Sequence, residues 1–327
     1  MVRVALVGVG VMGSKHAKIL KMMAEEGKCE FVACCDPIKK KVEKIAKETN
    51  TKGYQDVERM LSEERLDALI IATPTSQHSK VALSAIRKGI NVLIEKPISL
   101  CYEESLEVYE ESKKYGTMVG AGMTEVFNSA VENLKWMIEK RNLTLNTAIF
   151  NRLGFKNPRN DFTDTDVVYD LMIHDVSVIL EVLGYPTMRV IGARSLRLNK
   201  KSGFHDAATA LLTDGKSNIV LNASRVSEMK VRNFYMDFNE LYLQGDYMDQ
   251  KLNIFSSSTF EFSEASTNLW YNMAFNHTTT RYANNPLYDE DLDFISAIKN
   301  SRQPKVGPDQ WISIMKIMNE IESHLSQ

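Results

Sequence analysis

A glycine pattern near the start of the chain is the feature that most constrains its fold. A strand-like apolar run ends at Gly8, Gly10 and Gly13, and a helical pattern begins near Val11 and Met12. A strand, the spacing Gly-x-Gly-x-x-Gly and a helix, in that order, are typical of a dinucleotide site. Gly8 would allow a tight turn, Gly10 the approach of a pyrophosphate, and Gly13 close packing of the helix on the sheet. The phosphates would then lie over the N–H groups that begin the helix, at Val11 and Met12.

The distribution of strands and helices predicts two domains. A chain of 327 residues exceeds what one core usually serves. In residues 1–122 strands alternate with helices, which predicts a doubly wound Rossmann domain with a parallel sheet. In residues 123–327 successive strands lack intervening helices, which predicts an α/β domain with a large, mostly antiparallel sheet. The expected strands are residues 2–7, 30–35, 66–72, 91–94 and 118–122, and then 147–152, 190–196, 207–213, 218–223, 233–243 and 251–255.

Asp36 follows the second expected strand, a little over 20 residues beyond the last glycine of the pattern. A carboxylate there can accept hydrogen bonds from the adenosine ribose and would repel a 2′-phosphate, so NAD is favoured over NADP. An alternative is that Asp36 only caps a helix. Lys39 and Lys40 are close enough to keep NADP use open.

Two further strand ends carry polar side chains to the same edge of the predicted sheet. Thr73, Pro74 and His78 follow the third expected strand, and Glu95, Lys96 and Pro97 follow the fourth. Open α/β sheets bind ligands at the carboxyl ends of their strands. We therefore predict that all six residues line the cofactor site.

Asp170 and His174 stand four residues apart in an otherwise apolar helix. This spacing puts both side chains on one face of the helix. One interpretation is a core histidine satisfied by its own aspartate. The other is a catalytic pair, because histidine titrates near neutral pH and can act as a general base. No second histidine or cysteine lies at ligand spacing, so we predict no metal site.

Charge and composition exclude some classes of partner. The net charge is −2 and the isoelectric point is near 6.3, which argues against nucleic-acid and anionic-membrane partners. No apolar run is long enough to span a bilayer, and we expect a cytoplasmic protein. The cysteines show no metal-ligand spacing and are expected to be reduced and mostly buried: Cys29, Cys34, Cys35 and Cys101.

In combination, these motifs resemble the Gfo/Idh/MocA oxidoreductase family. The likeness spans essentially the whole chain and includes residues 285–295 and Pro304. It implies a Rossmann domain followed by an α/β domain, assembled into dimers or tetramers through the second sheet. It also implies that Lys96, Asp170 and His174 form the catalytic set, that Glu95 and Pro97 shape the nicotinamide side, and that the Lys96–Pro97 peptide is cis.

The substrate side departs from the family pattern. Where many members have Arg-Phe-Asn-Pro, this chain has Val126, Phe127, Asn128 and Ser129, so a contact made by that arginine does not carry over. Asn128 stays a substrate candidate.

The chain resembles most a subgroup that acts on nucleotide sugars such as UDP-N-acetylhexosamines. Arg152, Arg225 and Arg232 would match a substrate diphosphate, although each could equally be a charge at a strand edge.

These inferences predict an NAD-dependent enzyme that transfers hydride between nicotinamide and a secondary hydroxyl or keto carbon of a sugar, nucleotide sugar or polyol such as inositol. Such a reaction needs a base for the hydroxyl proton and a cation for the developing alkoxide. Lys96 and His174 supply these groups, with the proton acceptor left open between them. Alternatives are a non-catalytic sensor of dinucleotide or sugar, and an NADP-linked carbonyl reductase.

Overall fold

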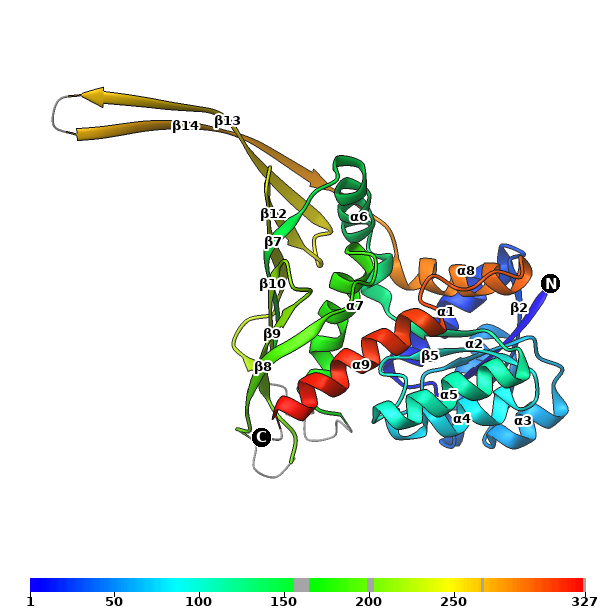
Figure 1. The fold of residues 1–327 in the computed structure, drawn as a ribbon. Coiled ribbons are helices and arrows are strands. Elements are labelled where there is room, and N and C mark those ends of the chain that lie inside the picture. Colours follow the sequence, from blue (N-terminus) through cyan, green and yellow to red (C-terminus); the bar gives the residue numbers. More distant parts are fainter. Residues whose placement is uncertain (156–164, 199–202, 266–267, 326–327) are drawn as a thin grey trace.

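A computed structural model describes residues 1–327 except 156–164, 199–202, 266–267 and 326–327. Most of the polar segment at 154–166 therefore lies outside the described residues. Two sheets organise the chain, and helices lie between and around them (Figure 1).

The first sheet is the predicted parallel Rossmann sheet. Its six strands lie in the order β3-β2-β1-β4-β5-β6, and every pair is parallel. The sequence analysis missed β3, which is only three residues long. The strands are β1 (Val2–Val7), β2 (Cys29–Cys35), β3 (Lys52–Tyr54), β4 (Ala68–Ile71), β5 (Asn91–Glu95) and β6 (Val119–Gly122). The helices between them are α1 (Val11–Glu25), α2 (Lys39–Thr49), α3 (Val57–Glu63), α4 (His78–Ile86) and α5 (Tyr102–Tyr115).

Two of the three pattern glycines are required by the backbone around them. Gly8 has a φ of +86°, and a Cβ there would lie 2.4 Å from the carbonyl oxygen of Ala72. A Cβ on Gly13 would lie 1.8 Å from the carbonyl oxygen of Gly8. The turn and the close helix–strand packing predicted for these residues are thus confirmed.

The second sheet is large and mostly antiparallel, as predicted. Its eight strands lie in the order β14-β13-β12-β11-β7-β10-β9-β8, and only β7 and β10 pair in parallel. The single strand expected at 233–243 was wrong, because the chain turns at residues 239–241 between two strands. The strands are β7 (Leu145–Phe155), β8 (Arg189–Leu196), β9 (Ala207–Thr213), β10 (Asn218–Ser227), β11 (Val231–Phe238), β12 (Tyr242–Asp246), β13 (Lys251–Ala265) and β14 (Asn268–Arg281).

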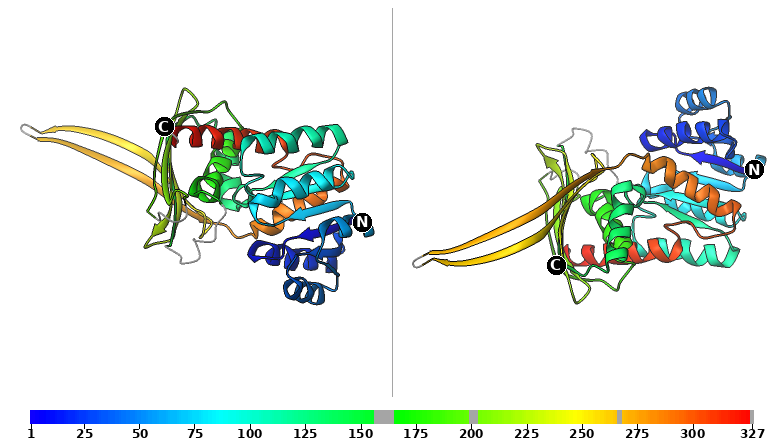
Figure 2. Two further views of the ribbon diagram at one scale, coloured as in Figure 1. Left: turned by 90° about the horizontal axis from the view of Figure 1, so that it is seen from below. Right: turned by 90° about the horizontal axis from the view of Figure 1, so that it is seen from above.

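Helices cover one face of the second sheet and connect it to the first. In Figures 1 and 2, α6 (Ser129–Arg141), α7 (Ile173–Val182) and α9 (Pro308–Leu325) lie on the side that faces the Rossmann sheet. Helix α8 (Pro286–Lys299) returns to pack beside α1, and its Leu287, Phe294 and Ile295 share a core with β1 and α1. The hydrophobic core of the first sheet therefore includes residues from both sides of the predicted boundary at residue 122, because α8 packs into it.

In the described part of the chain, three short helical turns follow strand ends or precede α7. They are η1 (Thr75–Gln77), η2 (Thr124–Phe127) and the π-helical turn η4 (Val168–Met172). No described helix is both long and apolar enough to cross a membrane.

Candidate active site

The start of α1 is open for an anionic ligand. No side chain caps this helix, and a Cβ on Gly10 would meet nothing within 4 Å. The N–H groups of a helix start attract phosphate when no side chain satisfies them. Val11 is 79% exposed at this position, so the first turn faces the outside. This geometry fits the pyrophosphate of a dinucleotide.

A cavity of about 430 Å³ continues from the glycine turn along the strand ends. Its lining includes Gly8, Pro37, Thr73 and Pro74. The Thr73 hydroxyl is buried without a hydrogen-bond partner in the described structure, which is costly unless a ligand supplies one. The cavity and the unpaired hydroxyl together fit the adenosine half of a dinucleotide.

Asp36 is buried at the end of β2 and fixes the turn beside it. One carboxylate oxygen accepts the Val9 N–H at 3.0 Å, and the other accepts the Ile38 N–H at 2.9 Å. The N-cap residue of α2 is Ile38. Asp36 is therefore not the helix cap that the alternative assumed.

His78 joins the two polar loops that follow β4 and β5. Its Nδ1 lies 2.7 Å from the Pro97 carbonyl oxygen and its Nε2 lies 2.9 Å from the Thr73 carbonyl oxygen. The side chain is buried, so it holds the loops together. Its direct contact with a cofactor stays a prediction.

Lys96 is anchored to Asp170 across the two domains. Its Nζ donates to the Asp170 carboxylate at 2.9 Å and to the Asp170 carbonyl oxygen at 2.6 Å. The Lys96–Pro97 peptide is cis, as the resemblance implied. Burial raises the pKa of Asp170, but the Lys96 cation outweighs it and the pKa is lowered overall. The predicted residues Lys96 and Asp170 thus form an ion pair in which both side chains keep some exposure.

His174 is the second residue of α7, just after the π-helical turn that holds Asp170. Its Nδ1 is buried and has no hydrogen-bond partner in the described structure. The interpretation of a core histidine satisfied by Asp170 therefore finds no support. Burial, and then the positive charges of Arg152, Lys96 and Arg232, hold the pKa of His174 well below its usual value. The imidazole is therefore neutral, the form in which a general base begins, while the same cations oppose its protonation.

Arg152 does not have the free donors expected of a substrate ligand. It is fully buried, and Asp175 accepts from it through both carboxylate oxygens at 2.9 and 3.1 Å. Glu125 accepts from a third nitrogen at 3.0 Å. A substrate phosphate would have to displace these carboxylates, so the predicted substrate contact is corrected to an internal ion pair.

Asn128 and Arg225 are likewise used inside the protein. Asn128 caps α6, and its amide nitrogen donates to the Tyr247 carbonyl oxygen at 3.0 Å. The guanidinium of Arg225 donates to the carbonyl oxygens of Thr165 and His205 at 3.1 and 2.8 Å. Both side chains are buried, so neither stays a substrate candidate.

Arg232 keeps access to solvent, unlike the other two predicted arginines. Its side chain is 31% exposed, and its contact with Glu125 is long, at 3.6 Å. On β11, Arg232 is the register partner of Arg152 on the neighbouring strand β7. Burial and the nearby Arg152 cation lower the pKa of Arg232. An anionic ligand here would relieve this repulsion.

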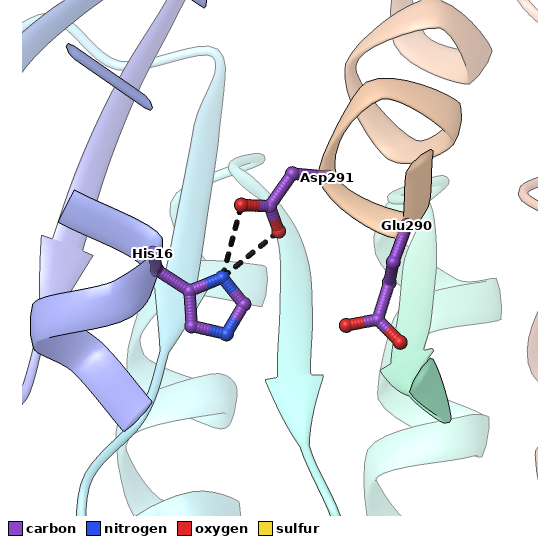
Figure 3. Close-up of side chains that lie close together, drawn as sticks. All are labelled: His16, Glu290 and Asp291. Atoms are coloured by element: carbon purple, nitrogen blue, oxygen red, sulfur yellow. Dashed lines mark hydrogen bonds and ion pairs between the residues drawn. The ribbon is translucent and has the colours of Figure 1, made fainter. Parts of the chain in front are cut away.

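The sequence analysis missed a buried cluster of His16, Glu290 and Asp291 (Figure 3). Candidate ligand atoms of these three residues lie within 4.8 Å of one another, the one such group found in the described part of the chain. His16 comes from α1, and the two acids come from α8. The only signals in the sequence were a histidine on the first helix and adjacent acids in a late amphipathic helix, and neither reveals that the helices touch.

Comparison with known proteins supports the fold and the cofactor class. Residues 2–123 match the Gfo/Idh/MocA model, described as an oxidoreductase family with an NAD-binding Rossmann fold. The chain is 27% identical to a UDP-N-acetylglucosamine 3-dehydrogenase of Acidithiobacillus ferrooxidans over 77% of this chain and 76% of that protein. It is 30% identical to a Bacillus subtilis scyllo-inositol 2-dehydrogenase (NAD(+)) over 58% of this chain and 56% of that protein.

Solved structures share the whole architecture. The structure of the Acidithiobacillus ferrooxidans enzyme superposes with a TM-score of 0.82 at 22% identity, over 99% of this chain and 97% of that one. At this identity the likeness establishes the fold. The two sheets and their connections are therefore a shared framework.

Proposed function

The chain belongs, through residues 2–123, to the Gfo/Idh/MocA oxidoreductases, and on that premise we propose that it is an NAD-dependent dehydrogenase of a sugar or nucleotide sugar. The hydride would pass between nicotinamide and a secondary hydroxyl or keto carbon of the substrate. The observation that carries the proposal is the ion pair of Lys96 with Asp170, together with a buried His174 whose Nδ1 has no partner among the described residues and whose pKa responds to the Lys96 charge.

The residues divide the chemistry between them. Nicotinamide, when bound, supplies the hydride acceptor. Lys96 provides a cation for the developing alkoxide, and Asp170 holds the Lys96 ammonium in place. His174 takes the hydroxyl proton, because its lowered pKa keeps the ring neutral at pH 7. The sequence left the proton acceptor open between Lys96 and His174. The ion pair that occupies Lys96 and the neutral ring of His174 favour His174.

The acidic surroundings of the cavity favour NAD over NADP. Asp36 lies at the end of β2, and Asp56 and Glu58 line the cavity. These negative charges would repel a 2′-phosphate, and Lys80 is the one basic residue among the described residues that line the cavity. We expect tighter binding of NADH than of NADPH, measured by fluorescence titration, and the reverse order would contradict this preference.

Arg232 points to a nucleotide sugar as the substrate class. It is the predicted arginine that keeps both exposure and an incompletely used guanidinium, and guanidinium matches diphosphate oxygens well. Arg232→Gln should raise KM for a UDP-hexosamine by about 10-fold, the size of one lost charge-assisted hydrogen bond. It should leave KM for inositol unchanged. Arg281→Gln, which removes an exposed arginine of β14, is the matched control, and equal effects of both variants would contradict the assignment.

The test of the proposed activity is turnover over a panel of sugars, UDP-hexosamines and inositols with NAD or NADP. We expect NADH formation with at least one UDP-hexosamine or hexose, and formation at least about 10²-fold slower from the Lys96→Ala variant. Binding of NADH without turnover of any panel compound would instead support a non-catalytic sensor. Turnover of simple carbonyl compounds with NADPH alone would support the reductase alternative.

We also infer that copies of this chain assemble through the second sheet. One face of that sheet lacks covering helices (Figure 1), and Ile149, Ile191 and Tyr242 are exposed on its strands. Strands β13 and β14 extend beyond the pairing with β12, which ends at Phe255. A two-stranded ribbon is marginally stable alone in water, so a second copy is the expected support. Light scattering should give a dimer or tetramer, whereas a monomer at micromolar concentration would contradict this.

A further inference from the structure

A buried row of charged side chains lies behind Lys96 and joins α1, β5 and α8. The Nδ1 atom of His16 lies 2.9 and 3.0 Å from the two carboxylate oxygens of Asp291, and its Nε2 lies 3.0 Å from Oε1 of Glu95. Figure 3 shows the His16 ring pointing at Asp291. Ionised carboxylates only accept hydrogen bonds, and a neutral imidazole donates only one. Burial opposes the charged ring, but Asp291 and Glu95 outweigh it and hold the pKa of His16 well above its usual value.

Glu290 stands beside this row with too few partners for an ionised group. Its Oε2 is buried without a hydrogen-bond partner in the described structure, and its Oε1 is 3.5 Å from the Thr124 hydroxyl. An isolated buried carboxylate is very costly, and a like charge nearby adds to the cost. Burial, and then the charge of Glu95, raise the pKa of Glu290 well above its usual value. Burial and the neighbouring acids therefore favour the neutral form of Glu290.

The row ends on the backbone that carries Lys96. The second carboxylate oxygen of Glu95 accepts the Lys96 N–H at 3.1 Å. Beyond that peptide, the Lys96 ammonium is held by Asp170. A continuous set of charge-assisted contacts thus runs from Asp291 through His16 and Glu95 to the proposed catalytic pair.

We propose that His16 is a positioning residue of the active site, which holds Glu95 and the Lys96 backbone to α8 through the contacts of its two ring nitrogens with Asp291 and Glu95. The proposal rests on the proposed role of Lys96. In the role proposed for His16, the packing of α8 beside α1 brings Asp291 to His16. The titratable groups that act on His16 are Glu95 of β5 and Glu290 and Asp291 of α8, while Cys29 of β2 interacts with Asp291 and Lys96 interacts with Glu95.

Kinetics of His16→Gln separate positioning from a merely structural role. We expect kcat to fall at least about 10-fold, the size of a modest misplacement of a catalytic group, with KM for NAD within about twofold because the glycine turn is not part of the row. In a Lys96→Ala background the same change should cost no further turnover, since it acts through Lys96. Tyr288→Phe is the matched control, because Tyr288 links α8 to Glu26 after α1 at the surface, and it should leave kcat unchanged.

A proton count tests the charge states even if His16→Gln does not fold. The pKa values of His16 and Glu290 are raised, so the folded state binds more protons from each group than the unfolded state does at a pH between that group's unfolded-state and folded-state pKa. The free energy of unfolding should therefore fall less steeply with rising pH in Glu290→Gln than in the native chain.

Two results would overturn the proposal. One is a fully additive loss of turnover when His16→Gln and Lys96→Ala are combined. The other is an equal proton count in the native chain and Glu290→Gln, together with a stoichiometric divalent metal, found by mass spectrometry, that the variant loses. A Lys96→Ala enzyme with the turnover of the native chain would contradict the proposed function itself, and with it the positioning role of His16.

Discussion

The carboxyl edge of the first sheet and the inner face of the second sheet use their polar residues in opposite ways. At the first, the chain leaves groups available to a ligand, such as the uncapped start of α1 and the unpaired Thr73 hydroxyl. At the second, Arg152 and Arg225 are consumed by internal partners. The strand ends of an open parallel sheet all face one crevice. Arg152 and Arg225 instead lie within strands of the second sheet, where alternate residues face the packed interior, so a charge there can brace that interior.

The largest expected effect tests the internal use of Arg152. Arg152→Met should lower the free energy of unfolding by about 3–5 kcal/mol, because it leaves Asp175 as a buried carboxylate without its partner. Adding Asp175→Asn should restore part of the loss. Urea denaturation measures both. Unchanged stability, combined with a raised KM for substrate, would return Arg152 to the substrate site and break the comparison.

A smaller effect distinguishes the glycines at the other edge. Gly13→Ala should cost about 1–3 kcal/mol of stability, as its Cβ would overlap the Gly8 carbonyl group. Gly10→Ala is the matched control, because a Cβ there meets only open space. It should preserve the melting temperature and weaken NADH binding. Normal NADH affinity in Gly10→Ala would argue against a pyrophosphate at that position.

The smallest expected effect concerns pH. The pKa of His174 is lowered, so its base form persists below the usual value of about 6.5 and is lost only as pH falls through the lowered pKa. The acid limb of the kcat/KM profile should therefore lie below about pH 6.5. A limb above that value would show that a different group is the base, because kcat/KM reports ionisations of the free enzyme.

The sequence predicted most of the first domain because its signals are local. Glycine spacing, strand ends and the Lys96, Asp170 and His174 motifs are properties of short segments, and the structure brings Lys96 and Asp170 into contact. The three residues of β3 were too short to give a periodic signal.

The errors arose where distant segments decide the outcome. Arg152 looks the same in sequence whether it meets substrate or Asp175, and only tertiary packing selects between them. The contact of His16 with Asp291 spans 275 positions. No spacing rule reaches that far, so the row behind Lys96 could be found only in the fold.

The most direct test of the central claim is single-turnover NADH formation by the native chain and by Lys96→Ala, His174→Gln and Arg225→Lys, with a UDP-hexosamine that the native chain oxidises. The account predicts losses of about 10²–10⁴-fold for the first two variants, the range for lost general base or alkoxide stabilisation. It predicts a rate within about threefold of native for folded Arg225→Lys, since Arg225 braces loops and does not meet substrate. Full rates in Lys96→Ala and His174→Gln, with loss in Arg225→Lys, would contradict it.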